Sequence, residues 1–130
     1  MVATASKKIV YLSQTFEGSV HDKKICDEEE LKFPDKIVLY QDSGYQGFKP
    51  ENVEVRMPTK KPKGRELTDE QKQVNRGQAK IRILIEHVNA SVKRCRIVKD
   101  MFRSWVYAWR DEVMLLACAL HNLRVHYRSP

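Results

Sequence analysis

Long apolar runs, cysteine pairs and glycines are scarce in this chain of 130 residues. No apolar run approaches the roughly 18 residues that a membrane span needs, and the first eight residues contain no signal-peptide core. The three cysteines, Cys26, Cys95 and Cys118, are far apart and form no C-x-x-C pair. This spacing argues against a disulfide framework and a structural zinc site. We therefore expect a cytoplasmic protein in which Cys118, inside an apolar segment, is a small buried side chain.

Positive charge is in excess, and it lies in the middle of the chain. The formal net charge is +7, with 24 Lys and Arg against 17 Asp and Glu. Residues 1–55 carry 7 basic and 10 acidic side chains, residues 56–110 carry 15 and 5, and residues 111–130 carry 2 of each. A basic middle favours a polyanionic partner such as nucleic acid. A solvated helix face beside a lysine-rich loop gives the same count, so charge alone leaves both interpretations open.

The first half of the chain predicts strands around a short helix, within an α/β protein of one domain. Residues 8–13 and 37–40 are β-branched and aromatic, which is typical of strands. Residues 21–32 between them favour a short charged helix. This order predicts a parallel crossover, with a second strand that is covered on both faces. Residues 53–57 alternate between apolar and polar side chains and predict one more short strand.

The second half predicts two helices after a basic linker. Prolines, a glycine and several cations in residues 58–67 predict an extended linker. Thr68 and Gln71 have the spacing of a capping box, so a long helix should begin there and continue to about Val98. A last helix over residues 111–127 is apolar nearly all round from Val113 to Leu120, which predicts burial on most sides.

The long helix carries an acidic residue beside its apolar stripe. The stripe consists of Ile81, Ile85, Val88 and Val92. The polar face consists of Arg82, Glu86, Asn89 and Lys93. At 100° per residue the two sets lie on neighbouring faces, so Glu86 stands at the margin of the core. Taken alone, an exposed ion pair between Arg82 and Glu86 is the simpler explanation of this pattern.

A second acidic residue, Asp42, directly follows the predicted strand 37–40. Open α/β sheets bind ligands at this end of their strands, although turn aspartates are also common there. Gly44 and Gly47 permit a sharp turn. Together with Glu86, Asp42 supplies the carboxylate oxygens that Mg²⁺ prefers and that two-metal phosphoryl transfer uses.

Several segments, taken in order, resemble one protein family. They are GSVHDK (18–23), QDSGYQG (41–47), PTKKPKG (58–64), LTDEQK (67–72), RILIEHV (82–88), KRCRI (93–97) and HNLR (121–124). In order and spacing they resemble the DDE transposases of bacterial insertion sequences and their Harbinger-type relatives. The resemblance implies a partial RNase H-like α/β fold, with a short mixed sheet, a crossover helix and two longer C-terminal helices.

The resemblance also implies roles for the matching residues. Asp42 and Glu86 would be catalytic carboxylates that bind Mg²⁺ or Mn²⁺, and the partner would be DNA, as transposon ends and as target. The basic residues that would bind DNA are Lys60, Lys61, Lys63, Arg82, Lys93, Arg94 and Arg96. Supporting residues beside the metal site would be Gly44, Tyr45, His21 and Asp22.

One departure from the family affects the expected activity. The family places its first catalytic aspartate on an opening strand, before the segment that begins here at Lys7, and residues 1–6 contain no acid. We therefore expect a nucleoid-associated, C-terminal part of a catalytic domain that lacks the first strand and is nearly inactive alone. Two alternatives remain. One is a non-catalytic DNA-binding remnant that uses the stretch from Lys60 to Arg103, and the other is a homo-oligomer or a complex with an N-terminal complementing fragment.

Overall fold

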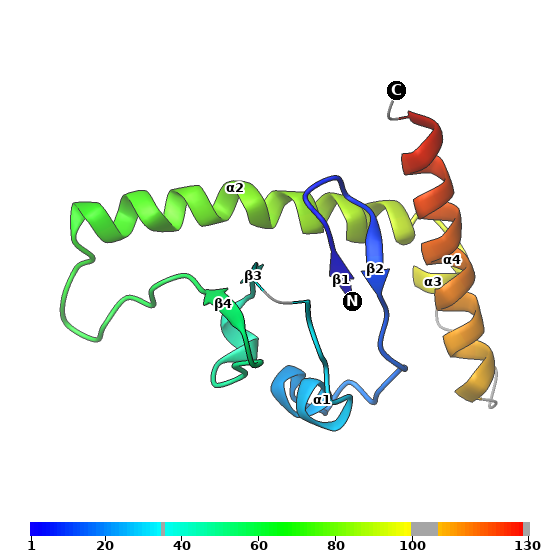
Figure 1. Ribbon diagram of the computed structural model, residues 1–130, viewed down its shortest axis with the longest axis horizontal. Coiled ribbons are helices and arrows are strands. Elements are labelled where there is room, and N and C mark those ends of the chain that lie inside the picture. Colours follow the sequence, from blue (N-terminus) through cyan, green and yellow to red (C-terminus); the bar gives the residue numbers. More distant parts are fainter. Residues whose placement is uncertain (35, 100–106, 129–130) are drawn as a thin grey trace. The chain divides into compact units, whose positions relative to one another are not determined.

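The computed structural model describes residues 1–34, 36–99 and 107–128 (Figure 1). Arg103, at the end of the predicted basic stretch, lies outside the described residues. The chain divides into two compact units. One contains residues 1–15 and the described residues from 83 onwards, and the other contains residues 16–82. Helices and short strands occur together, which confirms the α/β class.

The first unit begins with a small antiparallel sheet. Strand β1 (Val2–Ala3) pairs with β2 (Ile9–Tyr11), which is a shorter form of the predicted strand 8–13. The turn between them is closed by the Thr4 N–H, which donates to the Lys8 carbonyl at 2.9 Å. Lys7 has a positive φ of 66° in this turn. The first strands therefore form a local hairpin.

The core of this unit joins β2 to two helices, α2 (Asp69–Val92) and α4 (Tyr107–Arg128). Val88 and Val92 of α2 are almost fully buried, at 1% and 3% exposure, which confirms the predicted apolar stripe. Cys118 of α4 is buried as predicted, and this burial raises the pKa of its thiol. Ile9 completes the cluster from the sheet.

Helix α4 departs from the sequence prediction in its burial. It begins at Tyr107, four residues before the predicted start. The prediction that it is buried on most sides is wrong. Leu115 and Leu116 are 62% and 61% exposed, whereas Ala117 and Cys118 are buried. Within this unit the helix contributes one face to the core, so an apolar side chain on another face stays accessible.

Two side chains of α4 hold the edge of β2. The Asn122 side-chain oxygen accepts a hydrogen bond from the Ile9 N–H at 2.8 Å, and its amide nitrogen donates to the Ile9 carbonyl at 2.8 Å. Buried His121 donates from Nε2 to the Lys7 carbonyl at 2.8 Å. Asn122 thus pairs with Ile9 as a neighbouring strand would.

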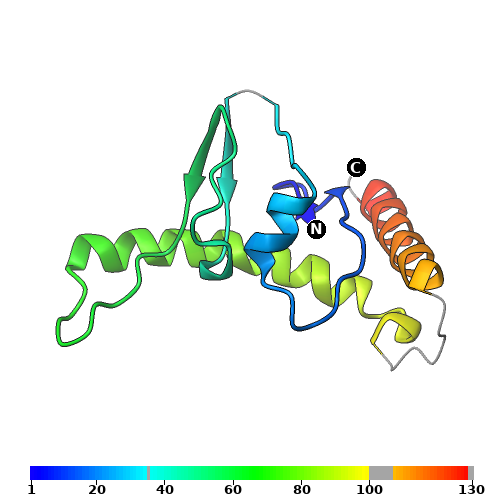
Figure 2. The same cartoon turned by 90° about the horizontal axis from the view of Figure 1, so that it is seen from below.

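The second unit contains a parallel strand pair. Strand β3 (Ile37–Tyr40) pairs with β4 (Val53–Arg56), and their two arrows run side by side in the same direction in Figure 2. The register joins Ile37 to Val53 and Tyr40 to Arg56. Both strands were predicted from the sequence, with nearly these bounds. Helix α1 (Asp22–Glu28), shorter than the predicted helix 21–32, precedes them.

The predicted parallel crossover from strand 8–13 to strand 37–40 is wrong. In the described part of the chain β2 and β3 belong to separate two-stranded sheets. One edge of β2 is taken by β1, and Ile9 is bonded on the other by Asn122. The prediction that strand 37–40 is covered on both faces also fails, because Val38 and Tyr40 are 41% and 38% exposed.

The predicted helix start is confirmed, and the segment predicted as a linker contains no helix or strand. Residues 57–68 contain no helix or strand, and Asn75 holds them through two hydrogen bonds to the Thr59 backbone, at 3.0 and 3.1 Å. The Thr68 N–H donates to Gln71 Oε1 at 3.1 Å, and the Gln71 N–H donates to Thr68 Oγ1 at 3.2 Å. These two bonds are a complete capping box.

Helix α2 ends at Val92, six residues before the predicted end. The Arg94 and Cys95 N–H groups donate to carbonyls only three residues back, at 3.3 and 3.1 Å, which tightens the last turn. A separate short helix, α3 (Arg96–Lys99), follows. No described helix is long and apolar enough to cross a membrane.

Replacement of Asn122 tests the side-chain pairing of β2. Asn122→Ala should lower the free energy of unfolding by about 2 kcal/mol, because two partly buried backbone groups of Ile9 lose their partner. The matched control is Asn89→Ala, an exposed asparagine on a helix, which should change it by less than about 0.5 kcal/mol. Urea unfolding followed by circular dichroism measures both. Equal stability of the two variants would contradict this account.

Candidate functional site

Asp42 leaves the end of β3 and starts a short turn of 3₁₀ helix, η1 (Ser43–Tyr45). Its backbone is extended, and its Oδ1 accepts a hydrogen bond from the Ser43 N–H at 2.7 Å. The carboxylate is 47% exposed. The strand therefore presents Asp42 at its carboxyl end with one oxygen fixed by the backbone and the other accessible.

Gln41 holds the loop that follows Asp42. Its side-chain nitrogen lies 3.1 Å from the Phe48 carbonyl, 3.4 Å from the Tyr45 carbonyl and 3.2 Å from Met57 Sδ. Its backbone N–H donates to the Arg56 carbonyl at 3.1 Å, which extends the pairing of β3 with β4. Sequence reasoning missed this positioning role. The signal available in the sequence was an amide side chain, Gln41, between the predicted strand 37–40 and Asp42.

Helix α1 packs against this loop through Asp22 and Lys23. A Cβ added at Gly44 would lie 2.7 Å from Asp22 Oδ2, so a side chain there would require the Asp22 side chain to shift. At Gly47, whose φ is 91°, an added Cβ would lie 3.4 Å from Lys23 Cε. Gly47 is thus required by its conformation, whereas Gly44 lies close to the Asp22 side chain.

Tyr45 closes the same loop. Burial raises the pKa of its phenol above the ordinary value, and the nearby charge of Asp22 raises it further. His21 precedes α1 at the N-cap position, where its side chain makes no capping hydrogen bond. Of the predicted supporting residues, Gly44 and Tyr45 therefore belong to the loop that follows Asp42, Asp22 lies beside it, and His21 lines a pocket with Ser43 and Gly44.

Arg82 of α2 forms an ion pair with Asp42. The distance from Arg82 Nη2 to Asp42 Oδ2 is 3.4 Å, and the side chains are 55% and 47% exposed. The sequence favoured a surface ion pair between Arg82 and Glu86, so the contact with Asp42 was missed. The structure brings together a residue predicted to bind metal and one predicted to bind DNA. At this exposure the pair contributes about 1 kcal/mol at most.

The other predicted residues of α2 and α3 lie in the first unit. Glu86, Lys93, Arg94 and Arg96 are all exposed there. Glu86 lies one helical turn after Arg82 in α2. Across residues 1–34, 36–99 and 107–128 no group of three or more His, Cys, Asp or Glu is placed to hold a metal ion.

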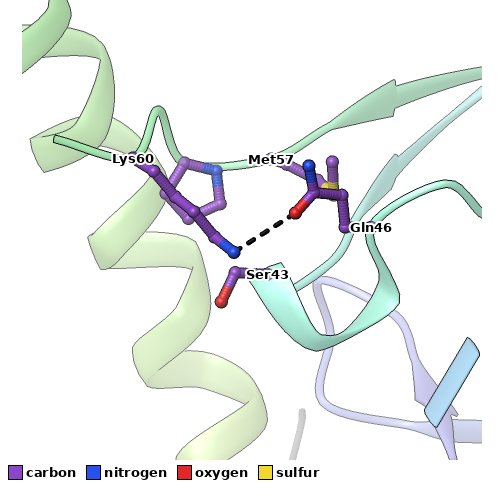
Figure 3. A pocket seen from close by; sticks show the side chains of 5 residues that line it. Ser43, Gln46, Met57 and Lys60 are labelled. Carbon is purple, nitrogen blue, oxygen red and sulfur yellow. Dashed lines mark hydrogen bonds between the residues drawn. The ribbon is translucent and has the colours of Figure 1, made fainter. Parts of the chain in front are cut away.

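The lysines of the basic linker differ in their partners. Lys60 donates to the neutral side-chain oxygen of Gln46 at 3.2 Å, beside a small open pocket of about 160 Å³ (Figure 3). Lys61 instead lies 3.9 Å from the carboxylate of Glu66. Lys63 is exposed. Neighbouring linker cations are therefore electrostatically distinct.

Comparisons with known proteins agree with the motifs. The family described as DDE superfamily endonuclease matches residues 1–122, which include both Asp42 and Glu86. The chain is 35% identical over 88 residues to the probable transposase for insertion sequence element IS702 of Microchaete diplosiphon, a match that covers 68% of this chain and 32% of that protein. The chain thus matches about a third of its relative's length, and no solved structure matches it significantly. Because the family match extends over nearly the whole chain, the protein belongs to the DDE superfamily endonucleases, the transposase family that its motifs resemble.

Proposed function

We propose that this chain is part of a DDE transposase that hydrolyses DNA at transposon ends and joins the 3′-hydroxyl to target DNA. Asp42 and Glu86 are its metal-binding carboxylates. The observation that carries the proposal is the 3.4 Å ion pair between Asp42 and Arg82. It sets the aspartate of the QDSGYQG loop against the helix on which Glu86 follows one turn later.

The donor chemistry at Asp42 fits Mg²⁺ or Mn²⁺. These ions prefer carboxylate oxygens and retain several waters, so a half-exposed carboxylate is a suitable ligand. Asp42 Oδ1 is oriented by the Ser43 N–H, and Oδ2 now faces the exchangeable cation Arg82. When bound, the metal would activate the attacking oxygen and stabilise the leaving one.

The residues of the chain itself would bind and orient the DNA. Phosphates attract cations regardless of base sequence, and such contacts fix the position of the duplex. The proposed phosphate contacts are Lys60, Lys61, Lys63, Arg82, Lys93, Arg94 and Arg96. Gln41 acts as a positioning residue, because its amide fixes the loop that carries Asp42.

We further propose that the fold is RNase H-like and that the isolated chain is nearly inactive. DDE chemistry uses three carboxylates, and the resemblance assigns two of them here. The third would come from a strand outside residues 1–130, in the same protein, in a separate N-terminal piece or in another copy. Partial support comes from β3, which pairs on one side with β4 and has no partner strand on its other side among the described residues.

A non-catalytic DNA-binding remnant is the second candidate. Residues 56–110 contain 15 basic and 5 acidic residues, and this positive charge favours a DNA-binding role. This role predicts DNA binding that survives Glu86→Gln and that Mn²⁺ does not strengthen. A transposase site predicts tighter DNA binding in Mn²⁺, with that gain lost in both Asp42→Asn and Glu86→Gln.

Removal of Arg82 should strengthen metal binding. Arg82→Gln is expected to raise the affinity for Mn²⁺ about two- to fivefold, since it removes the cation that competes for Asp42 Oδ2. Asp42→Asn should abolish the same binding. Calorimetric titration with Mn²⁺ measures both, and Arg76→Gln, an exposed arginine of the same helix, is the charge-matched control. If Arg82→Gln binds no more tightly than Arg76→Gln, Asp42 is not the metal ligand.

Nicking of supercoiled plasmid in Mn²⁺ tests the completeness of the site. The purified chain should nick no faster than its Glu86→Gln variant, because a metal site short of one carboxylate holds its ion weakly. Circular dichroism confirms that both proteins are folded. Nicking that Glu86→Gln abolishes would overturn the proposed inactivity and show that a third ligand is present.

A further inference from the structure

Two lysines from different elements reach the loop that follows Asp42. Lys23, on α1, lies along Gly47, where its Cε is 3.4 Å from the position of an added Cβ. Lys60, on the linker, donates to the side chain of the preceding residue, Gln46, at 3.2 Å. Figure 3 shows Lys60 reaching from the linker toward Gln46 and Ser43. Two ammonium groups thus lie beside consecutive loop residues.

Both lysines line one open pocket of about 530 Å³. The other lining residues are His21, Lys24, Asp27, Ser43, Gly44 and Gln46. Asp27 is the only acid among them, and it lies 3.7 Å from Lys23 Nζ. Lys24 is paired in turn with Glu28, at 3.6 Å. Lys60 differs from both, because its partner Gln46 is neutral, so its charge makes this wall of the pocket favour an anion.

The partner of Lys60 is neutral, and this matters for binding. An amide oxygen holds the ammonium group in place without cancelling its charge, so little side-chain entropy remains to be lost when an anion binds. Lys61 differs because the carboxylate of Glu66 lies 3.9 Å from its Nζ and offsets part of its charge. Ser43 adds a hydroxyl donor at the same wall. A tetrahedral anion with several acceptor oxygens matches these donors.

We propose that this pocket, lined by Lys23, Lys60, Ser43 and Gln46, is a phosphate subsite for one backbone phosphodiester of the DNA strand. The inference rests on the proposed function, since it requires DNA as the ligand. It adds Lys23, Ser43 and Gln46 to the phosphate-binding residues. Because Ser43 directly follows Asp42, a phosphate held here fixes the strand beside the carboxylate.

The main test compares two neighbouring lysines of the linker. Binding of a fluorescein-labelled 30-base-pair DNA duplex is followed by anisotropy in EDTA, at several NaCl concentrations. Lys60→Gln should weaken binding about fivefold or more and reduce the salt slope by about 1. Lys61→Gln removes the same charge from the next residue and should change the affinity and the salt slope less, because Glu66 offsets part of the Lys61 charge.

Two further variants distinguish binding of a phosphate in the pocket from nonspecific electrostatic attraction between DNA and the chain. Gln46→Leu keeps every charge but releases Lys60, so its affinity should fall about threefold with a nearly unchanged salt slope. Asp27→Asn removes the one acid of the pocket and should raise affinity about twofold. Circular dichroism checks that each variant is folded.

The outcomes distinguish this subsite from the proposed function. Salt-dependent binding by the parent chain, with Lys60→Gln and Lys61→Gln equally weakened, overturns the subsite and leaves the DNA partner in place. No salt-dependent binding by the parent chain overturns both. Selective loss in Lys60→Gln, together with the gain in Asp27→Asn, supports the subsite.

Discussion

The parallel pairing of β3 with β4 fixes the candidate site within its unit. Parallel strands cannot be joined by a tight hairpin, so the chain must leave the end of β3 and travel back before β4 begins. Residues 41–52 make that return, and they contain Asp42, Ser43 and both close-packed glycines. Gln41 ties the start of this connection to its middle through three contacts. The topology therefore places a loop that Gln41 holds directly after the carboxylate of Asp42.

The contacts of α1 explain why this loop tolerates little change. Asp22 and Lys23 are consecutive residues, and each lies against a different glycine of the loop. Asp22 contributes a negative charge beside Tyr45, and Lys23 contributes a positive charge beside Gly47. A short helix of seven residues thus shapes the electrostatics of the loop as well as its path.

Local patterns in the sequence predicted the local structure well. The strand 37–40, the capping box of Thr68 and Gln71, and the stripe that buries Val88 depend on residues within a few positions of one another. What failed depends on distant partners. The pairing of β2 is decided by Asn122, more than a hundred residues away, whose amide occupies the edge that a crossover strand would need. The exposure of Leu115 likewise depends on which face of α4 its unit covers.

The candidate site shows the same division. That Asp42 ends a strand and that Glu86 lies on a polar helix face could be predicted, because each is a matter of position along one element. The ion pair of Asp42 with Arg82 could not, since the sequence offers Glu86 as an equally near acid. The sequence also could not predict that Lys60 contacts the neutral Gln46 while Lys61 contacts the acidic Glu66, because several side chains lie equally near in the sequence. Identical side chains in a linker are distinguished only by what the fold places beside them.

Under the proposed function, the ion pair of Asp42 with Arg82 would make metal and DNA binding interdependent. Asp42 keeps Arg82 occupied through an exposed ion pair that is weak enough to exchange. A divalent ion at Asp42 would repel Arg82 and free its guanidinium, which is well shaped for bidentate contact with a phosphate. Linkage requires the reverse as well, so a phosphate that draws Arg82 away would leave Asp42 a better metal ligand. One arginine thereby couples the two ligands that phosphoryl transfer brings together.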